Sequence, residues 1–76
     1  MAQGELDRAA GAALKDLRTA RGMSQEALAM AAEVDQSMLS KIERLGPSAT
    51  GWTRFCRIAD ALGHEVVVTL RPRSAG

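Results

Sequence analysis

The chain has 76 residues, of which 46% are hydrophobic, and its ten basic and nine acidic residues give a formal net charge of +1. This length fits one small domain close to the lower size at which a core alone is sufficient, so oligomerisation is a natural source of added stability. The single Cys56 and the single His64 exclude an internal disulfide and supply no usual zinc-ligand set, so no metal or other cofactor is expected.

The first two predicted elements are helices. Apolar residues at helical spacing, with acids at the start and Gly22 just past the end, predict a helix from about Glu5 to Arg21. Its apolar positions are Leu6, Ala10, Ala13, Leu14 and Leu17. Ser24 is a typical N-cap, so a second helix is expected over residues 25–32.

Two more helices follow. Asp35 is expected to cap a third helix over residues 36–44, and the stretch LGPSATG has the composition of a turn. A fourth helix is expected from residue 50 or 51 up to the closing Gly63. Its apolar positions place Trp52 and Phe55 in the core, beside Ile58, Ala59 and Leu62.

The C-terminal segment HEVVVTLRPR has a different composition, because a β-branched run replaces the helical spacing. A lone strand leaves its backbone groups unpaired, so this segment is predicted to pair with its copy in a second subunit as an antiparallel ribbon. The predicted dimerisation residues are Val66, Val67, Val68, Thr69 and Leu70. A tail that frays or packs on its own chain is the alternative.

The second and third helices are joined by almost no linker, which is typical of a helix-turn-helix. Small or apolar residues at one spacing would bury the inner sides of both helices and fill the turn: Leu28, Ala29, Ala32, Val34, Leu39 and Ile42. Two helices locked at a steep angle leave one side of the third helix exposed. That polar side has the size and chemistry to enter a DNA major groove.

The stretch LKDLRTARGMSQEALAMAAEVDQSMLSKIER, followed by RIADALG, resembles the phage-repressor and Cro-like helix-turn-helix family, often called the XRE family. The likeness covers about residues 14–63. The segment GHEVVVTLRPR further resembles HipB-type antitoxins, in which a terminal strand pairs between the subunits of a DNA-binding dimer. The resemblance implies an all-α, lambda-repressor-like bundle of four to five helices over residues 1–63, with a dimerising strand and tail over residues 64–76.

Position by position, the resemblance also implies functional residues. Gln36, Ser37, Ser40 and Lys41 are the groove-facing set, and the Gln36 amide suits the edge of an adenine. The expected phosphate contacts are Gln25, Lys41 and Arg44. Arg18 and Glu43 take the places of an ion pair between the first and third helices that supports the fold.

Three departures from the family pattern affect this interpretation. Glu33 stands where the turn needs a positive φ and a glycine is common, at a cost of about 1 kcal/mol. Asp35 places a carboxylate near the expected phosphates, where Ser or Thr is usual. The loop LGPSATG lacks the basic residues often found there, which predicts modest and salt-dependent affinity for DNA.

The function favoured by these patterns is a homodimeric, sequence-specific repressor of transcription that binds double-stranded DNA at a palindromic operator. An autoregulating antitoxin, with a toxin or other regulatory protein as a second partner, is one form of it. The alternative is a protein-interaction module, an antiactivator or toxin-binding adaptor, that keeps the fold without binding DNA. We expect no enzymatic activity, because no nucleophile and base pair and no phosphate-cradling glycine loop is present.

The N-terminal residues and the distribution of charge along the chain bear on its location and its partners. Glu5, Asp7 and Arg8 interrupt residues 1–14, which therefore do not resemble a signal peptide, and a cytoplasmic protein without a membrane partner is expected. The stretch 15–57 has more basic than acidic residues, and Arg71 and Arg73 add a basic tail. On charge alone, a nucleic-acid partner and an ordinary solvated surface both remain open.

Overall fold

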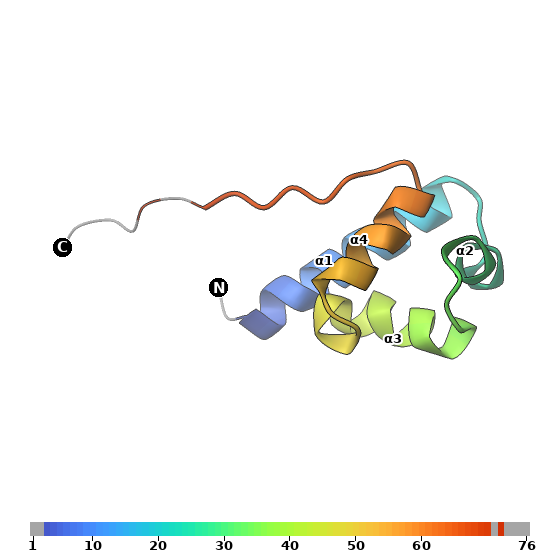
Figure 1. Cartoon of the computed structure of the whole chain (residues 1–76), viewed down its shortest axis with the longest axis horizontal. Coiled ribbons are helices and arrows are strands. Elements are labelled where there is room, and N and C mark those ends of the chain that lie inside the picture. Colours follow the sequence, from blue (N-terminus) through green and yellow to red (C-terminus); the bar gives the residue numbers. More distant parts are fainter. Residues whose placement is uncertain (1–2, 71, 73–76) are drawn as a thin grey trace.

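The computed structural model describes residues 3–70 and 72. Within them the chain forms four α-helices and one turn of 3₁₀ helix (Figure 1). The elements are α1 Gln3–Ala20, α2 Gln25–Ala32, α3 Gln36–Leu45, η1 Gly46–Ala49 and α4 Trp52–Ala61. The predicted all-helical bundle of four to five helices is confirmed. None of the described helices is both long and apolar enough to span a bilayer.

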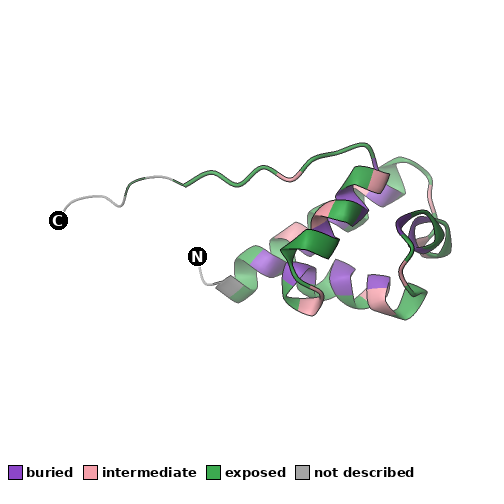
Figure 2. Ribbon diagram, in the orientation of Figure 1, coloured by how far each residue is buried: buried purple, intermediate pink, exposed green. Residues whose placement is uncertain are grey.

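The core lies where α2, α3 and α4 meet the inner side of α1. The largest side chains with essentially no solvent exposure are Leu28, Leu39, Ile42, Ile58 and Leu62. Burying each of them stabilises the fold by about 1.5–3 kcal/mol. Figure 2 shows that the buried positions face one another across the helices, while the outer sides are exposed. The inward spacing predicted for α2 and α3 is therefore confirmed.

Two glycines let α1 approach the end of α3 backbone to backbone. A Cβ added to Gly11 would lie 2.5 Å from the carbonyl oxygen of Ile42 and 2.8 Å from the amide nitrogen of Gly46. Gly46 itself has φ 71°, and a Cβ there would overlap the backbone of Asp7. Only residues without a side chain allow this contact, so the packing of α1 on the α3–η1 junction depends on both.

Side chains near the C-terminal ends of α1 and α4 hold these ends together. The Arg21 guanidinium donates a hydrogen bond to the carbonyl oxygen of Leu62. The same carbonyl lies 2.9 Å from Nδ1 of His64, which can donate to it in the tautomer that carries a proton there. Both contacts satisfy a carbonyl at the end of α4 that the helix leaves without an internal partner.

The connection from α3 to α4 differs from the simple turn that was predicted. Its first half is the 3₁₀ turn η1, in which Pro47 is buried. Gly51 then takes φ 90° and α4 begins at Trp52, one or two residues later than expected.

Trp52 is 40% exposed and meets Phe55 edge to face, with ring centroids 5.8 Å apart, so its predicted place in the core is wrong. Leu6, also predicted to face inward, is 51% exposed because the first turns of α1 extend past α4.

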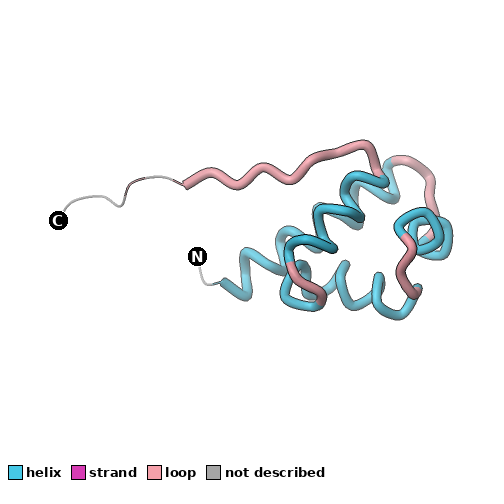
Figure 3. Tube along the Cα trace, in the orientation of Figure 1, coloured by secondary structure: helices cyan, strands magenta, loops and turns pink. Residues whose placement is uncertain are grey.

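Residues 64–70 run away from the helices as an extended segment (Figure 3). In the described part of the single chain this segment forms no strand. The predicted strand needs a second copy to pair with, so the pairing between subunits stays a prediction. Val67, Val68 and Leu70 are 73%, 64% and 91% exposed. Arg71 and Arg73, which were expected to form a basic tail, lie outside the described residues.

Candidate nucleic-acid interface

The turn between α2 and α3 has the geometry of a helix-turn-helix. Glu33 takes φ 59° and ψ 45°, the left-handed conformation for which a glycine is the usual choice. The Glu33 amide donates to the carbonyl of Met30 and the Val34 amide to that of Ala29, which closes the end of α2. Val34 then packs against the core. The chain thus keeps the required turn with a glutamate, at a cost of about 1 kcal/mol.

The start of α3 differs from the prediction in its cap. Asp35 occupies the N-cap position with extended backbone angles, but its carboxylate accepts no hydrogen bond from the first turn of α3. Only its backbone carbonyl takes part, accepting from the amide of Leu39 at 2.9 Å. By contrast, the Ser24 hydroxyl caps α2 as predicted and accepts from the amide of Ala27 at 3.0 Å. The Asp35 carboxylate is therefore exposed beside the N-terminus of α3.

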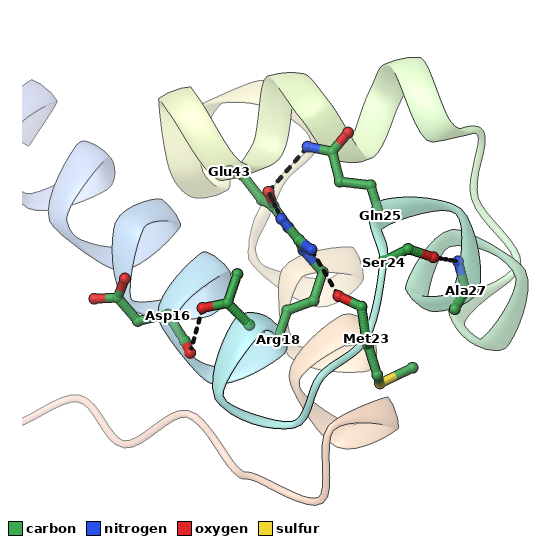
Figure 4. Close-up of polar contacts among 8 residues, drawn as sticks. Asp16, Arg18, Met23, Ser24, Gln25, Ala27 and Glu43 are labelled. Atoms are coloured by element: carbon green, nitrogen blue, oxygen red, sulfur yellow. Dashed lines mark hydrogen bonds and ion pairs between the residues drawn. The ribbon is translucent and has the colours of Figure 1, made fainter.

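A buried polar network fixes the angle between α1, α2 and α3 (Figure 4). The Arg18 guanidinium donates to both carboxylate oxygens of Glu43, with Nε 2.6 Å from Oε2 and Nη2 3.1 Å from Oε1. Nη1 of Arg18 donates to the carbonyl of Met23 at 2.7 Å, and Nε2 of Gln25 donates to Oε1 of Glu43 at 3.0 Å. One carboxylate on α3 is thus tied to α1 and to the first residue of α2.

The two charged groups of this network shift each other's pKa in the direction that keeps both charged, although both are buried. Hydrogen bonding to Glu43 raises the pKa of Arg18 above its usual value, against the opposing effect of burial. Burial on its own would raise the pKa of Glu43, but the hydrogen bonds from Arg18 and Gln25, with the charges of Arg18 and Lys15, lower the pKa below its usual value. Both groups therefore keep their charges in the folded protein near neutral pH.

The side of α3 opposite this core is polar and exposed. Each residue turns the helix by about 100°, so Gln36, Ser40, Arg44, Ser37 and Lys41 follow one another within an arc of about 140°. Leu39 and Ile42 lie outside the arc and have no solvent exposure. We call these five polar residues the α3 polar face. On one side it is bordered by Glu43, which bonds Gln25 of α2. On the other side Leu45 and then Met38 follow, and Met38 lines a hollow together with residues of α4.

The structure brings five of the six predicted DNA-contact residues together on this face. Gln36, Ser37, Lys41 and Arg44 are exposed and Ser40 is half-buried. Gln25 lies on α2 at the Glu43 border of the face, half-buried and already bonded to that carboxylate. An amide NH₂ has two hydrogens, so one donor of Gln25 remains for an external acceptor.

A hollow at the other border of the face was not predicted. It has a volume of about 490 Å³, and we call it the α3–α4 cleft; it is lined by Met38, Ala49, Thr50, Thr53, Arg54 and Arg57. The sequence does contain a signal for it, because the two arginines are three residues apart and share one side of α4. What the sequence could not show is that this side of α4 faces the flank of α3.

A family model described as a helix-turn-helix domain matches residues 9–70, most of the chain. The chain belongs to the helix-turn-helix domain family. No curated protein and no solved structure matches the chain. The matched range contains every element from the middle of α1 to the extended segment, and therefore the whole interface described above. Helix-turn-helix domains present a helix to the major groove, so membership indicates a DNA-binding regulator.

Proposed function

We propose that this helix-turn-helix protein is a sequence-specific transcriptional repressor of the XRE type, acting as a homodimer on a palindromic operator. The observation that carries the proposal is the α3 polar face, which is held outward by a buried apolar side and by the Arg18–Glu43 ion pair. A polar helix held at a fixed angle can enter the major groove without reorganising the domain.

The proposed roles follow from the chemistry of each side chain. Gln36, in the first turn of α3, has a donor and an acceptor that together match the edge of an adenine, and Ser37 and Ser40 are short partners for neighbouring bases. Lys41 and Arg44 are the cations of the face and would bind phosphates or a guanine. On α2, the second amide hydrogen of Gln25 would donate to a phosphate at the groove wall.

The homodimer is proposed to form through residues 66–70. In the single chain these residues expose large apolar side chains, and a hollow of about 390 Å³ separates them from Leu6 and Trp52. An antiparallel ribbon with a second copy would satisfy the backbone of the segment and cover this apolar surface. Two copies related by a two-fold axis would place their α3 helices in successive major grooves, about 34 Å apart.

A second candidate is a protein-interaction module with the same fold, including the toxin-binding part of an autoregulating antitoxin. The observation that favours it is the exposed apolar surface formed by Trp52 and the extended segment, together with the exposed carboxylates of Glu33 and Asp35 beside α3. An apolar surface rimmed by polar residues is typical of a protein contact.

Selection of bound sites from random duplex DNA tests the repressor directly, because it reports half-site sequence and spacing together. We expect two inverted half-sites whose centres are about one helical turn apart. Binding of the selected duplex should weaken steeply with salt, since phosphate contacts release counterions. Absence of an enriched sequence, combined with a flat salt dependence, would favour the interaction module.

Two substitutions on the α3 polar face separate base reading from phosphate binding. Gln36→Ala is expected to relax base preference at one operator position, at a cost of about 1–3 kcal/mol. Lys41→Ala is expected to weaken binding to all sequences alike, because a phosphate contact carries no sequence information. Site selection with each purified variant is the measurement. A Gln36→Ala profile identical to that of the unaltered protein would remove Gln36 from the base-reading set.

A further inference from the structure

We infer that the α3–α4 cleft is a phosphate-binding site, in which Arg54 and Arg57 hold the DNA backbone on the flank of α3 opposite Gln25. This inference rests on the proposed function and extends it to residues outside the α3 polar face. The two arginines of the cleft would replace the basic residues often found in the α3–α4 loop, because in this chain the loop stretch LGPSATG contains none.

The first argument is the position of the cleft. Around α3, Glu43 lies on one side of the polar face and Met38 on the other, and they lead to α2 and α4 respectively. A major groove is about 12 Å wide and a helix with its side chains about 10–12 Å across, so a helix in the groove has a sugar–phosphate strand close to each flank. Met38 lines the cleft together with both arginines. The cleft therefore lies where the second strand would pass.

The second argument is the state of the two arginines. Both are exposed, and neither forms an ion pair or donates a hydrogen bond to any residue that the structure describes. Arg18 and Arg21, by comparison, are both bonded to other parts of the chain. Two cations three residues apart on one helix repel each other when no anion lies between them. Arg54 and Arg57 thus form a site for an external anion.

The third argument is the chemistry of the cleft wall. Thr53 adds an exposed hydroxyl, and the Thr50 hydroxyl is buried without a hydrogen-bond partner among the described residues. Two guanidinium groups and the hydroxyl of the exposed Thr53 suit the oxygens of a phosphate. The nearby carboxylates of Glu33 and Asp35 line a separate hollow of about 310 Å³, which shares only Met38 and Arg54 with the cleft. The cleft itself is lined by no acid, so the phosphate would lie between Arg54 and Arg57, on the side of Arg54 away from Glu33 and Asp35.

The test measures binding of the selected operator duplex at several salt concentrations, using the full chain and the variants Arg54→Gln, Arg57→Gln and their combination. Each lost phosphate contact should reduce the slope of log K against log salt by about 0.9, so the double variant should lose about 1.8. Base preference should not change. Arg8→Gln is the matched control, because it removes the charge of an exposed arginine on α1 that lines neither hollow beside α3, and it should keep the slope of the unaltered protein.

The outcomes separate this inference from the proposed function. If the unaltered protein binds no duplex, the proposed function fails, and the DNA assignment of the cleft fails with it. If the unaltered protein binds but the double variant keeps its slope, or Arg8→Gln loses as much, the cleft inference alone is wrong.

Inorganic phosphate, titrated into the protein and followed by amide chemical shifts at Thr50, Thr53 and Arg54, distinguishes the source of the phosphate. Weak binding that disappears in the double variant supports the site. Binding of free phosphate that requires both arginines, combined with an unchanged DNA slope, would assign the cleft to a soluble anion and overturn the assignment to DNA.

Discussion

Two regions of this protein differ in how completely their polar and apolar groups find partners within the chain. At the corner where α1, α2 and α3 meet, Glu43 is held by Arg18 and Gln25, and apolar neighbours close the space around them. In the segment of residues 66–70 the side chains are largely exposed, and no described residue pairs with its backbone. The corner is determined from within the chain, whereas the segment has surface left for a partner.

The difference distinguishes residues that stabilise the fold of the single chain from residues that leave a surface for a partner. A buried network of matched donors and acceptors fixes one relative angle of three helices, and the α3 polar face depends on that angle. An exposed apolar segment contributes little to the stability of its own chain, because its surface stays in water. Substitutions in the two regions should therefore have effects of different size and of different kind.

The largest effect is expected from breaking the ion pair at the corner. Arg18→Met leaves the Glu43 carboxylate, whose side chain is 2% exposed, without its charged partner. Removing one member of a buried pair costs about 3–5 kcal/mol. Urea unfolding followed by circular dichroism should show this loss in the free energy of unfolding, which is a large part of the stability of so small a domain.

The double variant Arg18→Met with Glu43→Leu is the matched control, because it removes both charges together. Buried pairs replaced by apolar residues of similar volume are often neutral or more stable. We expect the double variant to recover most of the stability lost by Arg18→Met. A double variant as unstable as the single one would show that shape, rather than the buried charge, determines the corner.

The next effect concerns the backbone contact between α1 and α3. Helix propensity alone predicts that Gly11→Ala stabilises α1 by up to about 1 kcal/mol. The added Cβ would lie 2.5 Å from the Ile42 carbonyl oxygen, so we expect instead a loss of about 1–3 kcal/mol in the free energy of unfolding.

Gly4→Ala tests the same substitution without the close contact, since its Cβ would meet only the flexible end of Arg8 at 3.4 Å. It should be neutral or slightly stabilising in the same urea titration. If Gly11→Ala proved as harmless as Gly4→Ala, the approach of the two backbones would be looser than the structure indicates.

Much of the corner could be predicted from the sequence because its determinants are local. Helical spacing identified Leu39 and Ile42 as buried, and the cap at Ser24 followed from residue type. The need for a positive φ at Glu33 came from the family resemblance and agrees with the observed turn. These features depend on a few consecutive residues and a repeating geometry.

The features that were missed depend on contacts between distant parts of the chain. Nothing in the local sequence of Gly11 shows that it meets the backbone at Gly46. Trp52 has core spacing on α4, but whether it is covered depends on how the first turns of α1 and the extended segment lie beside it. The α3–α4 cleft likewise depends on how η1 and α4 are placed beside Met38 of α3. The dimerising strand stays a prediction, since it depends on a second chain.

A smaller effect at the corner appears on acidification. The pKa of Glu43 is lower in the folded protein than in the unfolded chain, so its pair stabilises the fold above the unfolded value of about 4.5. That contribution is lost as the pH falls through the lower folded pKa. The difference in the free energy of unfolding between the unaltered protein and Glu43→Gln should narrow below about pH 4.5. A difference that stays constant down to pH 3 would contradict the assignment.

The smallest effect on the stability of the single chain is expected in the extended segment. Successive residues of an antiparallel strand alternate in whether their amides point to the partner strand, so a proline at one of the two positions, Val67 or Val68, must remove a donor from the ribbon. Both positions are exposed in the single chain, and the free energy of unfolding at concentrations where the chain is monomeric should change by no more than about 0.5 kcal/mol.

The association of two chains should respond quite differently to these prolines. For the unaltered protein the midpoint of unfolding should rise with protein concentration, because dimerisation stabilises the folded state by mass action. One of the two proline variants should abolish this dependence and sediment as a monomer, whereas Val67→Thr, which keeps the amide and the β-branched shape, should sediment as a dimer. Sedimentation unchanged by both prolines would show that the segment does not pair between subunits, and the exposed apolar surface beside Trp52 would then belong to a different protein partner.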